Sequence, residues 1–105
     1  MKFYYVYILK CADGSYYTGI TSRLQERMDE HREGQDKKAY TYFRRPVVLV
    51  FYEAFTEVEQ AITFEKKIKR WSRRKKEALI NKDWNKLVIY SKNYTQYRDK
   101  QDREE

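Results

Sequence analysis

Four side chains that could act on a phosphodiester lie within the first 31 residues. Tyr7 and Tyr17 supply phenols, Arg27 supplies a guanidinium, and His31 is the only histidine of the chain. A guanidinium can bind two phosphate oxygens at once, and an imidazole can move a proton near neutral pH. A phenol can align or deprotonate a water, or donate to a phosphate oxygen. These residue types predict a site that cleaves phosphodiester bonds.

Helical spacing would place two of these side chains together. Arg27 and His31 are four residues apart, so they share one face of a helix. They lie one position round from Leu24 and Met28, an apolar pair that should face the core. Both functional side chains are therefore expected along the edge of the buried face. A solvated charge beside a structural histidine is the alternative interpretation.

Two strands joined by a tight turn would bring the phenols together. Residues 3–10 are rich in aromatic and β-branched side chains, which suits a half-buried strand. An Asp-Gly pair then signals a hairpin, and a second, antiparallel strand is expected over residues 15–20. Tyr7 and Tyr17 would be cross-strand neighbours in this hairpin. Simple packing of two large rings is the alternative explanation.

Cap and turn residues set the next boundaries. Thr21 or Ser22 is expected to cap the helix that follows the hairpin, and Gly34 to end it in a left-handed conformation. Residues 35–45 mix polar and aromatic side chains and are expected to form an ordered loop. A proline then opens a buried strand over residues 47–52, which would complete a three-stranded sheet.

A longer helix carries the candidate metal ligand. Thr56 and Glu59 form a capping box, and apolar residues then follow the helical period as far as Trp71. Glu65 lies on the shoulder of that apolar stripe. A carboxylate with open coordination positions suits Mg²⁺, which keeps several waters and bridges to a substrate phosphate. We therefore expect Glu65 to bind one divalent ion; a solvated glutamate is the alternative. A further helix is expected from Ser72.

The charge of the chain points to a polyanionic partner. The formal net charge is +7 and the pI is about 9.4, and nucleic acid is the commonest acidic partner. A dense basic run follows the candidate metal ligand and could neutralise backbone phosphates. The expected phosphate contacts are Lys66, Lys69, Arg70, Arg73, Arg74, Lys75 and Lys76. No base-reading motif is present, so recognition of backbone or shape is expected; a merely solvated basic face is the alternative.

Size and composition limit the remaining possibilities. The 105 residues leave room for one small domain, expected over residues 1–90, with a polar tail over residues 91–105. Cys11 is the only cysteine, which excludes an intrachain disulfide and a cysteine-rich metal site. No apolar run reaches the roughly 20 residues of a membrane helix, and the start lacks the pattern of a signal peptide. A reducing, cytoplasmic setting without a membrane partner is expected.

Taken in order, these residues resemble the GIY-YIG nuclease superfamily. The first tripeptide element stands here as Tyr5-Val6-Tyr7, and the second as Tyr17-Thr18-Gly19. The Arg-x-x-x-His step of the next helix and the downstream helical glutamate also match. Residues 61–80 further resemble the small stand-alone bacterial branch, the YhbQ-like proteins. The resemblance covers nearly the whole chain, up to about residue 87.

The resemblance implies a fold, a chemistry and a role for each residue. The fold would be a compact α/β (α+β) domain with a central three-stranded antiparallel sheet flanked by helices. The activity would be endonuclease hydrolysis of nucleic acid, foremost DNA, with one Mg²⁺ or Mn²⁺ ion, in repair or recombination. Tyr7 would be the general base or water-orienting phenol, and Tyr17 would position the nucleophile or phosphate. Arg27 would stabilise phosphoryl charge, His31 would take up the proton, and Glu65 would hold the metal.

The sequence departs from the superfamily pattern at three positions. Tyr5 replaces a glycine and could narrow the site or stack on substrate, whereas Val6 and Thr18 keep β-branching in place of isoleucine. Asn81 is a weak candidate for an asparagine that some members add after the metal-binding helix. Related nucleases often carry a separate DNA-binding region that this chain lacks, so a protein partner could deliver the substrate. A non-catalytic, basic nucleic-acid-binding module is therefore the alternative function.

Overall fold

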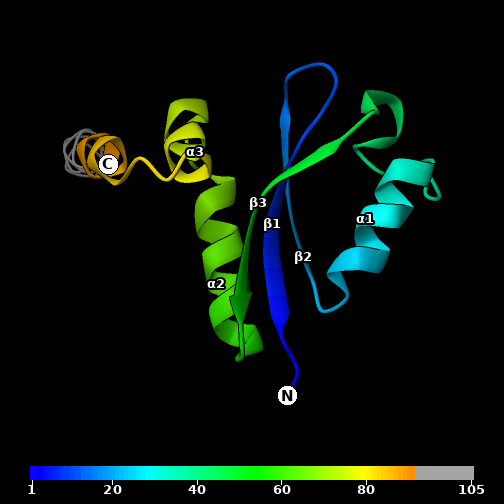
Figure 1. Cartoon of the computed structure of the whole chain (residues 1–105), viewed down its shortest axis with the longest axis horizontal. Helices are drawn as coiled ribbons and strands as arrows, with labels where there is room; N and C mark the ends of the chain where they lie inside the picture. The colour runs from blue at the N-terminus through cyan, green and yellow to red at the C-terminus, as the bar shows by residue number, and fades with distance from the viewer. Residues whose placement is uncertain (92–105) are drawn as a thin grey trace, which may run out of the picture. The chain divides into compact units, whose positions relative to one another are not determined.

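Three strands form one antiparallel sheet, in the order β2-β1-β3. The structure, a computed structural model, describes residues 1–91. Along the chain the labelled elements are β1 (Tyr4–Lys10), β2 (Tyr16–Thr21), α1 (Leu24–Glu33), the 3-10 turn η1 (Tyr42–Arg44), β3 (Val48–Phe55), α2 (Val58–Lys69) and α3 (Arg73–Ile80) (Figure 1). The α+β architecture with a three-stranded antiparallel sheet is confirmed.

The backbone divides into two units, Met1–Arg70 and a second that begins at Trp71. The first unit contains the sheet, α1, η1 and α2. The single domain expected over residues 1–90 stays a prediction. The tail was expected over residues 91–105, and all of it except residue 91 lies outside the described residues. Within residues 1–91, no helix combines the length and the apolar character needed to cross a membrane.

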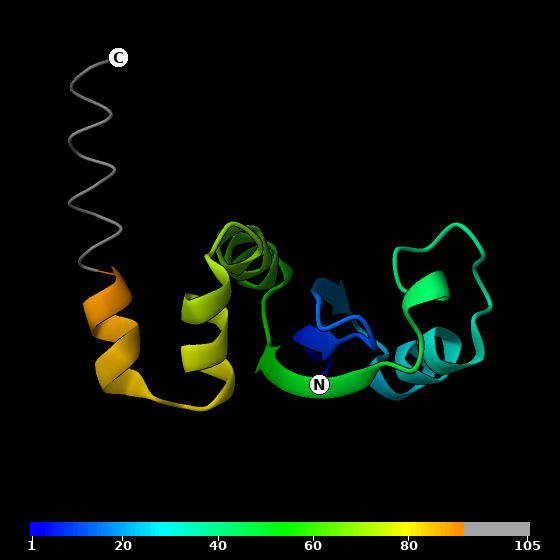
Figure 2. The same cartoon turned by 90° about the horizontal axis from the view of Figure 1, so that it is seen from above.

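The central strand β1 places its side chains alternately on two covered faces. In Figures 1 and 2 the strands lie between α1 and α2. On the α1 side, a core cluster joins strand residues to the helix and to the loop after it: Tyr7, Leu9, Cys11, Met28 and Val47, with Tyr17, Leu24 and Leu49 packed against them. Because both faces of β1 are covered, this strand is apolar or aromatic at nearly every position. Cys11 is a buried free thiol in this cluster.

The face of the sheet that carries α2 is held by aromatic contacts. Phe64 of α2 meets two rings of β3, those of Phe51 at 6.5 Å and Phe55 at 5.4 Å between centroids. Ala61 and Ile68 of the same helix are fully buried. The apolar stripe predicted for this helix is confirmed as far as Ile68, and it fixes which face α2 turns to the strands. Trp71 lies beyond the helix, which ends at Lys69.

One glycine is required by the packing of Tyr7. Gly19 pairs with Tyr7 across β1 and β2, and the tyrosine ring lies directly over its α-carbon. A β-carbon at position 19 would lie closer than 3.0 Å to the ring, a distance that real β-carbons do not show. The glycine therefore lets the phenol sit flat against the sheet.

Two of the expected helix caps are wrong. The N-cap of α1 is Arg23, and the Thr21 hydroxyl instead accepts the Arg23 N–H at 3.0 Å in a turn just before the helix. The N-cap of α2 is Glu57, which makes no side-chain cap, so the capping box predicted at Thr56 does not form. The left-handed end of α1 at Gly34 is confirmed, with φ of 67°.

The strand boundaries differ slightly from those expected. β1 begins one residue later, and β2 is shifted by one residue. β3 continues to Phe55, three residues beyond the expected end, because its last residues pair with the start of β1. Pairing with β1, rather than local turn signals, therefore decides where β3 ends.

The segment over residues 35–45 is an ordered loop, as expected. The Arg44 guanidinium donates to the Tyr40 carbonyl at 2.7 Å and pairs with Asp13 at 3.2 Å. Arg45 donates to the Tyr42 carbonyl at 2.9 Å and to the Arg32 carbonyl, near the end of α1, at 3.5 Å. Two arginines thus fasten this loop to the hairpin and to α1.

The second unit contains α3 and further helical residues. Ser72 caps α3 by accepting the Lys75 N–H at 3.3 Å, which confirms the helix start expected there. Residues 84–91 are also helical, and the Asp83 carboxylate accepts the Lys86 N–H at 3.1 Å at their beginning.

Replacing Gly19 with alanine should lower the free energy of unfolding by about 1–3 kcal/mol, the usual cost of overpacking. Urea denaturation of both proteins measures this cost. In a Tyr7→Leu background the same replacement should cost clearly less, because the ring that meets the new methyl group is gone. Equal costs in the two backgrounds would contradict this explanation of the glycine.

Candidate active site

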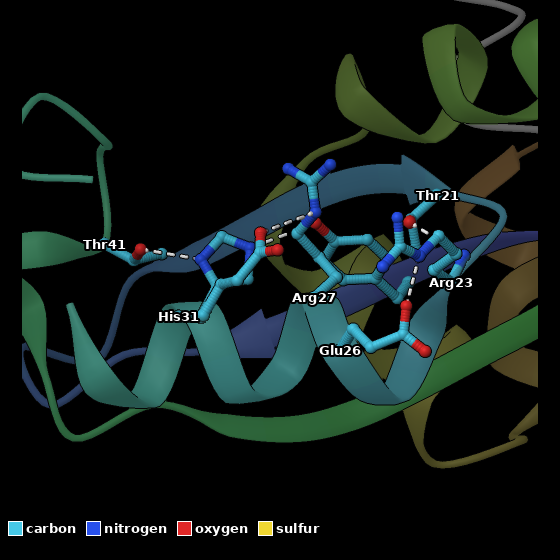
Figure 3. A network of polar contacts seen from close by, with 8 residues as sticks. Thr21, Arg23, Glu26, Arg27, His31 and Thr41 are labelled. Carbon is cyan, nitrogen blue, oxygen red and sulfur yellow. Dashed lines mark hydrogen bonds and ion pairs between the residues drawn. The ribbon is translucent and has the colours of Figure 1, made fainter. Parts of the chain in front are cut away.

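A chain of hydrogen bonds runs from β1 through α1 to the loop after it. The Tyr7 Oη and His31 Nε2 atoms lie 3.1 Å apart, and His31 Nδ1 lies 2.8 Å from the Thr41 Oγ1 (Figure 3). All three residues are buried, with exposed fractions of 1%, 8% and 1%. The imidazole therefore bridges two hydroxyl groups that have little access to solvent.

The second phenol lies beside this chain. The Tyr17 ring centroid is 6.3 Å from that of Tyr7 and 5.4 Å from that of His31. Tyr40, from the loop, stacks on Tyr17, with 5.9 Å between the ring centroids and 23° between the ring planes. Tyr17 is partly exposed, so its hydroxyl can meet a ligand, whereas the Tyr7 phenol is buried.

Arg27 projects from the same side of α1 as His31 (Figure 3). Its Nε atom lies 3.5 Å from the Glu30 Oε1, and both side chains are about half exposed, at 46% and 47%. Burial, together with the positive charge of Arg27, lowers the pKa of His31 from its ordinary value of 6.5, while Glu30 opposes this shift. His31 is therefore a neutral imidazole at pH 7.

The Tyr7 phenol is held in its protonated form. Burial is the main cause that raises its pKa well above the usual value for tyrosine, and the nearby Tyr17 acts in the same direction. The charge of Arg27 opposes these effects, and the carboxylates of Glu30 and Glu65 add to them. A neutral phenol can donate its O–H to an imidazole nitrogen that carries no proton, or accept from one that does, so the direction of this hydrogen bond depends on the tautomer of His31.

An open pocket of about 430 Å³ adjoins the hydrogen-bond chain. A pocket of this size can admit a nucleotide. It lies between α1 and the loop, and its lining residues are Tyr17, Arg27, Glu30, His31, Gly34, Gln35, Asp36, Ala39 and Thr41. One cation, two carboxylates and the neutral histidine thus face the same hollow.

Glu65 is placed differently from the other four predicted residues. Like the buried Tyr7, it is absent from the lining of the pocket, to which Tyr17, Arg27 and His31 contribute. Its side chain is only 12% exposed on α2, and Oε2 pairs with the Lys69 ammonium at 3.1 Å. Its charge nevertheless raises the pKa of Tyr7, so the carboxylate lies within electrostatic range of that phenol. The structure brings Tyr7, Tyr17, Arg27 and His31 together, whereas the role of Glu65 stays a prediction.

The donor set around Glu65 suits a hydrated ion. Among residues 1–91, no group of three or more His, Cys, Asp and Glu side chains gathers to enclose a metal. Zinc needs such an enclosure, whereas Mg²⁺ keeps several waters and is commonly held by one or two carboxylates and a substrate phosphate. A single, mostly buried carboxylate fits the second pattern.

The expected phosphate contacts of the first unit are exposed. Lys66, Lys69 and Arg70 all lie at the surface at the end of α2. Lys69 is paired with Glu65. Of these three, Lys66 and Arg70 are therefore better placed to meet a phosphate backbone.

The expected contacts of the second unit are less uniform. Arg73 pairs with Glu77 at 3.5 Å, and the Arg74 guanidinium lies 4.6 Å from the centroid of the Tyr90 ring. Lys76 is partly buried. Lys75 is 6% exposed, with its ammonium 4.2 Å from the Trp71 ring centroid, so it departs from the expected surface cation. Attraction to the aromatic face accounts for this position.

Two further predictions concern residues outside the pocket. Asn81 caps the end of α3 and is exposed in the second unit. The centroid of the Tyr5 ring lies 6.4 Å from that of Phe3 and 6.1 Å from that of Tyr52. Tyr5 is not among the residues that line the pocket. Its ring packs against aromatic side chains before β1 and on β3, and its suggested effect on the site stays a prediction.

Among the residues of the site that sequence reasoning missed are Glu30, Tyr40 and Thr41. Glu30 was visible as the acidic neighbour, three positions on, of Arg27. The other two lie in the loop, where the only local signal is a hydroxyl residue between aromatic residues. Their contacts with His31 and Tyr17 arise from tertiary structure.

The protonation of His31 can be tested directly, because it is the only histidine. Its NMR titration should have a midpoint below 6.5, since burial and Arg27 disfavour the imidazolium. The unfolded chain then binds the proton more tightly than the folded one, so the contribution of His31 to the free energy of unfolding should fall as the pH drops below about 6.5 and be constant above it. The variant His31→Gln should lose this dependence, and a midpoint at or above 6.5 would contradict the assignment.

Comparison with known proteins agrees with the geometry. Residues 3–78 match the family model of the GIY-YIG catalytic domain. The UPF0213 protein of Bacillus pumilus is 46% identical over 77 residues, which are 73% of this chain and 78% of the relative. The UPF0213 protein SSP2268 of Staphylococcus saprophyticus is 46% identical over 81 residues, 77% of this chain and 98% of the relative.

Solved structures show the same similarity. The solution NMR structure of the UPF0213 protein BH0048 from Bacillus halodurans has a TM-score of 0.51 at 44% identity, over 75% of this chain and 83% of that one. The solution NMR structure of EF2693 from E. faecalis has a TM-score of 0.56 at 34% identity, over 78% of this chain and 86% of that one. The chain therefore belongs to the GIY-YIG catalytic-domain family, a nuclease superfamily, and is similar to the small bacterial UPF0213 proteins.

Proposed function

We propose that this chain is a divalent-metal-dependent endonuclease that hydrolyses phosphodiester bonds of nucleic acid, foremost DNA. The observation that carries the proposal is the 3.1 Å contact between the Tyr7 phenol and the neutral His31 imidazole beside an open pocket. Membership of a nuclease superfamily supports the reaction class. A cytoplasmic role in DNA repair or recombination is part of the same proposal.

The phenol and the imidazole can activate water as a pair. Tyr7 passes its proton to His31 Nε2 while its oxygen takes a proton from the attacking water. The hydroxide adds to phosphorus, the bond to the leaving oxygen breaks, and that oxygen takes up a proton from solvent. Tyr7 is thus restored as a phenol, and His31 carries the proton as imidazolium until solvent removes it.

The resting site does not favour this transfer. Burial raises the pKa of Tyr7 and lowers that of His31, so without substrate the proton stays on the phenol. Binding of a phosphate at Arg27 would offset the positive charge that disfavours the His31 imidazolium. Proton transfer would therefore be coupled to the arrival of the substrate.

Arg27 is the group best placed to hold the phosphate. It lines the pocket beside His31, and its ion pair with Glu30 runs through Nε. The two terminal nitrogens can then bind two phosphoryl oxygens in the bidentate manner typical of arginine. Tyr17, which is partly exposed in the same lining, can donate to a third oxygen.

Glu65 would hold the metal ion. A bound Mg²⁺ or Mn²⁺ would neutralise charge that develops on the phosphate and leaving oxygen. Glu65 would have to exchange its contact with Lys69 for the ion, which is a modest change because that lysine is half exposed. The same exchange would release Lys69 toward a phosphate.

A non-catalytic nucleic-acid-binding module is the second candidate. The exposed cations at the end of α2, Lys66 and Arg70, favour it, because they need no catalytic group in order to bind a backbone. Under either function, a protein partner could bring the substrate to this small domain.

Cleavage assays on plasmid, single-stranded and branched DNA with Mg²⁺ or Mn²⁺ test the enzyme directly. The variant Tyr7→Phe should lower kcat by about 100-fold or more, since it removes a general acid–base group. Glu65→Gln should abolish the stimulation by metal. Tyr4→Phe on β1 and Glu59→Gln on α2 are matched controls and should behave as wild type.

The controls also define failure. Cleavage that is resistant to EDTA and equal in wild type and Glu65→Gln would contradict the metal-dependent mechanism. Salt-dependent DNA binding that survives Tyr7→Phe and Glu65→Gln, with no cleavage of any substrate, would establish the binding module instead.

The basic surface makes a separate prediction about binding. The double variant Lys66→Ala/Arg70→Ala should weaken DNA binding to a similar extent on all sequences. It should also reduce the slope of log K against log salt by about 1 for each phosphate that the variant no longer neutralises. Fluorescence anisotropy over a range of salt concentrations measures both effects, and an unchanged slope would exclude these cations from the interface.

A further inference from the structure

Thr41 meets the side of His31 that faces away from Tyr7. Its hydroxyl lies 2.8 Å from Nδ1, and only 1% of the residue is exposed. Water has little access to either group, so the two depend on one another for hydrogen bonding. A buried hydroxyl in a surface loop is unusual, because most loop hydroxyls face solvent.

The loop around Thr41 is held rigidly on both sides. On one side Tyr40 stacks on Tyr17, and the Arg44 guanidinium lies over the Tyr40 ring, 3.8 Å from the ring centroid. On the other side Arg45 donates to the Tyr42 carbonyl. The Arg44 N–H closes the 3-10 turn on the Thr41 carbonyl at 3.0 Å. Thr41 is therefore fixed between two anchored residues.

A second fastening ties this loop to α1. Arg45 reaches the Arg32 carbonyl at 3.5 Å and crosses directly over Gly34. A β-carbon at position 34 would lie closer than 3.0 Å to that guanidinium. The helix that carries His31 and the loop that carries Thr41 are thus joined independently of the contact between the two residues. The alignment of the hydroxyl with Nδ1 is a product of this framework.

Proton balance assigns a direction to the contact. A neutral imidazole carries one N–H, and the proposed base must keep Nε2 unprotonated in order to accept the Tyr7 proton. The ring proton must then be on Nδ1, and Thr41 Oγ1 must accept it. When Nε2 becomes protonated as well, both nitrogens donate, and Thr41 again has to accept. One orientation of the hydroxyl serves both states.

We propose that Thr41 is a positioning residue for His31: its hydroxyl accepts the Nδ1 proton and so leaves Nε2 free to take the proton of Tyr7. The consequence for cleavage rests on the proposed nuclease function. The tautomer itself does not, and it can be measured on the protein alone. Where a hydrogen-bond partner orients a metal-binding histidine in this way, its mutation lowers metal affinity or activity by about 10- to 100-fold.

The tautomer is read from the ¹⁵N shifts of the full-length protein labelled at histidine, at a pH where His31 is neutral. His31 is the only histidine, so every imidazole signal belongs to it. Wild type should show the proton on Nδ1, and Thr41→Ser should do the same. Thr41→Val, which keeps the size but removes the hydroxyl, should shift the proton toward Nε2. Thr63→Val is the control, since that hydroxyl contacts the Glu59 carbonyl on α2.

Each outcome decides the proposal. A wild-type proton on Nε2 overturns it, and this measurement needs no variant that might fold poorly. Thr41→Val with the wild-type pattern, in a protein whose amide spectrum is otherwise native, also overturns it. In the cleavage assay, Thr41→Val should lower kcat by about 10- to 100-fold with little change in KM, and Thr41→Ser should restore it. If wild type cleaves nothing, the nuclease proposal fails, while the tautomer still decides the role of Thr41.

Discussion

The buried contact between Tyr7 and His31 is the interaction on which the rest of the site depends. It joins the central strand to α1 at 3.1 Å. Residue 19 is a glycine, and the absence of a side chain there lets the Tyr7 phenol lie against the sheet. It also supplies Thr41 to complete the hydrogen bonding of the imidazole. Glycine, strand, helix and loop each satisfy a requirement of this one contact.

In the proposed mechanism, electrostatics keep the pair inactive until a ligand arrives. Burial favours the neutral form of both groups, and Arg27 further disfavours a charged imidazole. The same arginine would bind the phosphate, so substrate would offset the charge that keeps His31 neutral. Glu65 acts from α2, across the strands from α1, and contributes at Tyr7 through its charge. The proposed chemistry therefore draws on both covered faces of the sheet.

The fold and the proximity of four of the five catalytic candidates could be predicted because their signals are local. Alternating aromatic residues around an Asp-Gly turn define the hairpin, and a four-residue step on a helix defines the Arg27–His31 face. The caps at Thr21 and Thr56 failed because a hydroxyl before a helix can satisfy a preceding turn, or go unused, as readily as it caps. Thr41 could not be predicted, since its partner is set by the arginines that fasten the loop. No local pattern records such a contact.

The central claim is that Tyr7 and His31 act as one proton-transferring unit. Single-turnover cleavage by Tyr7→Phe, His31→Gln and the double variant tests this most directly, because residues that act as a unit show non-additive losses. The account predicts that the double variant is within a few-fold of the slower single variant. Losses that multiply would show that the two side chains act independently, and would contradict the account.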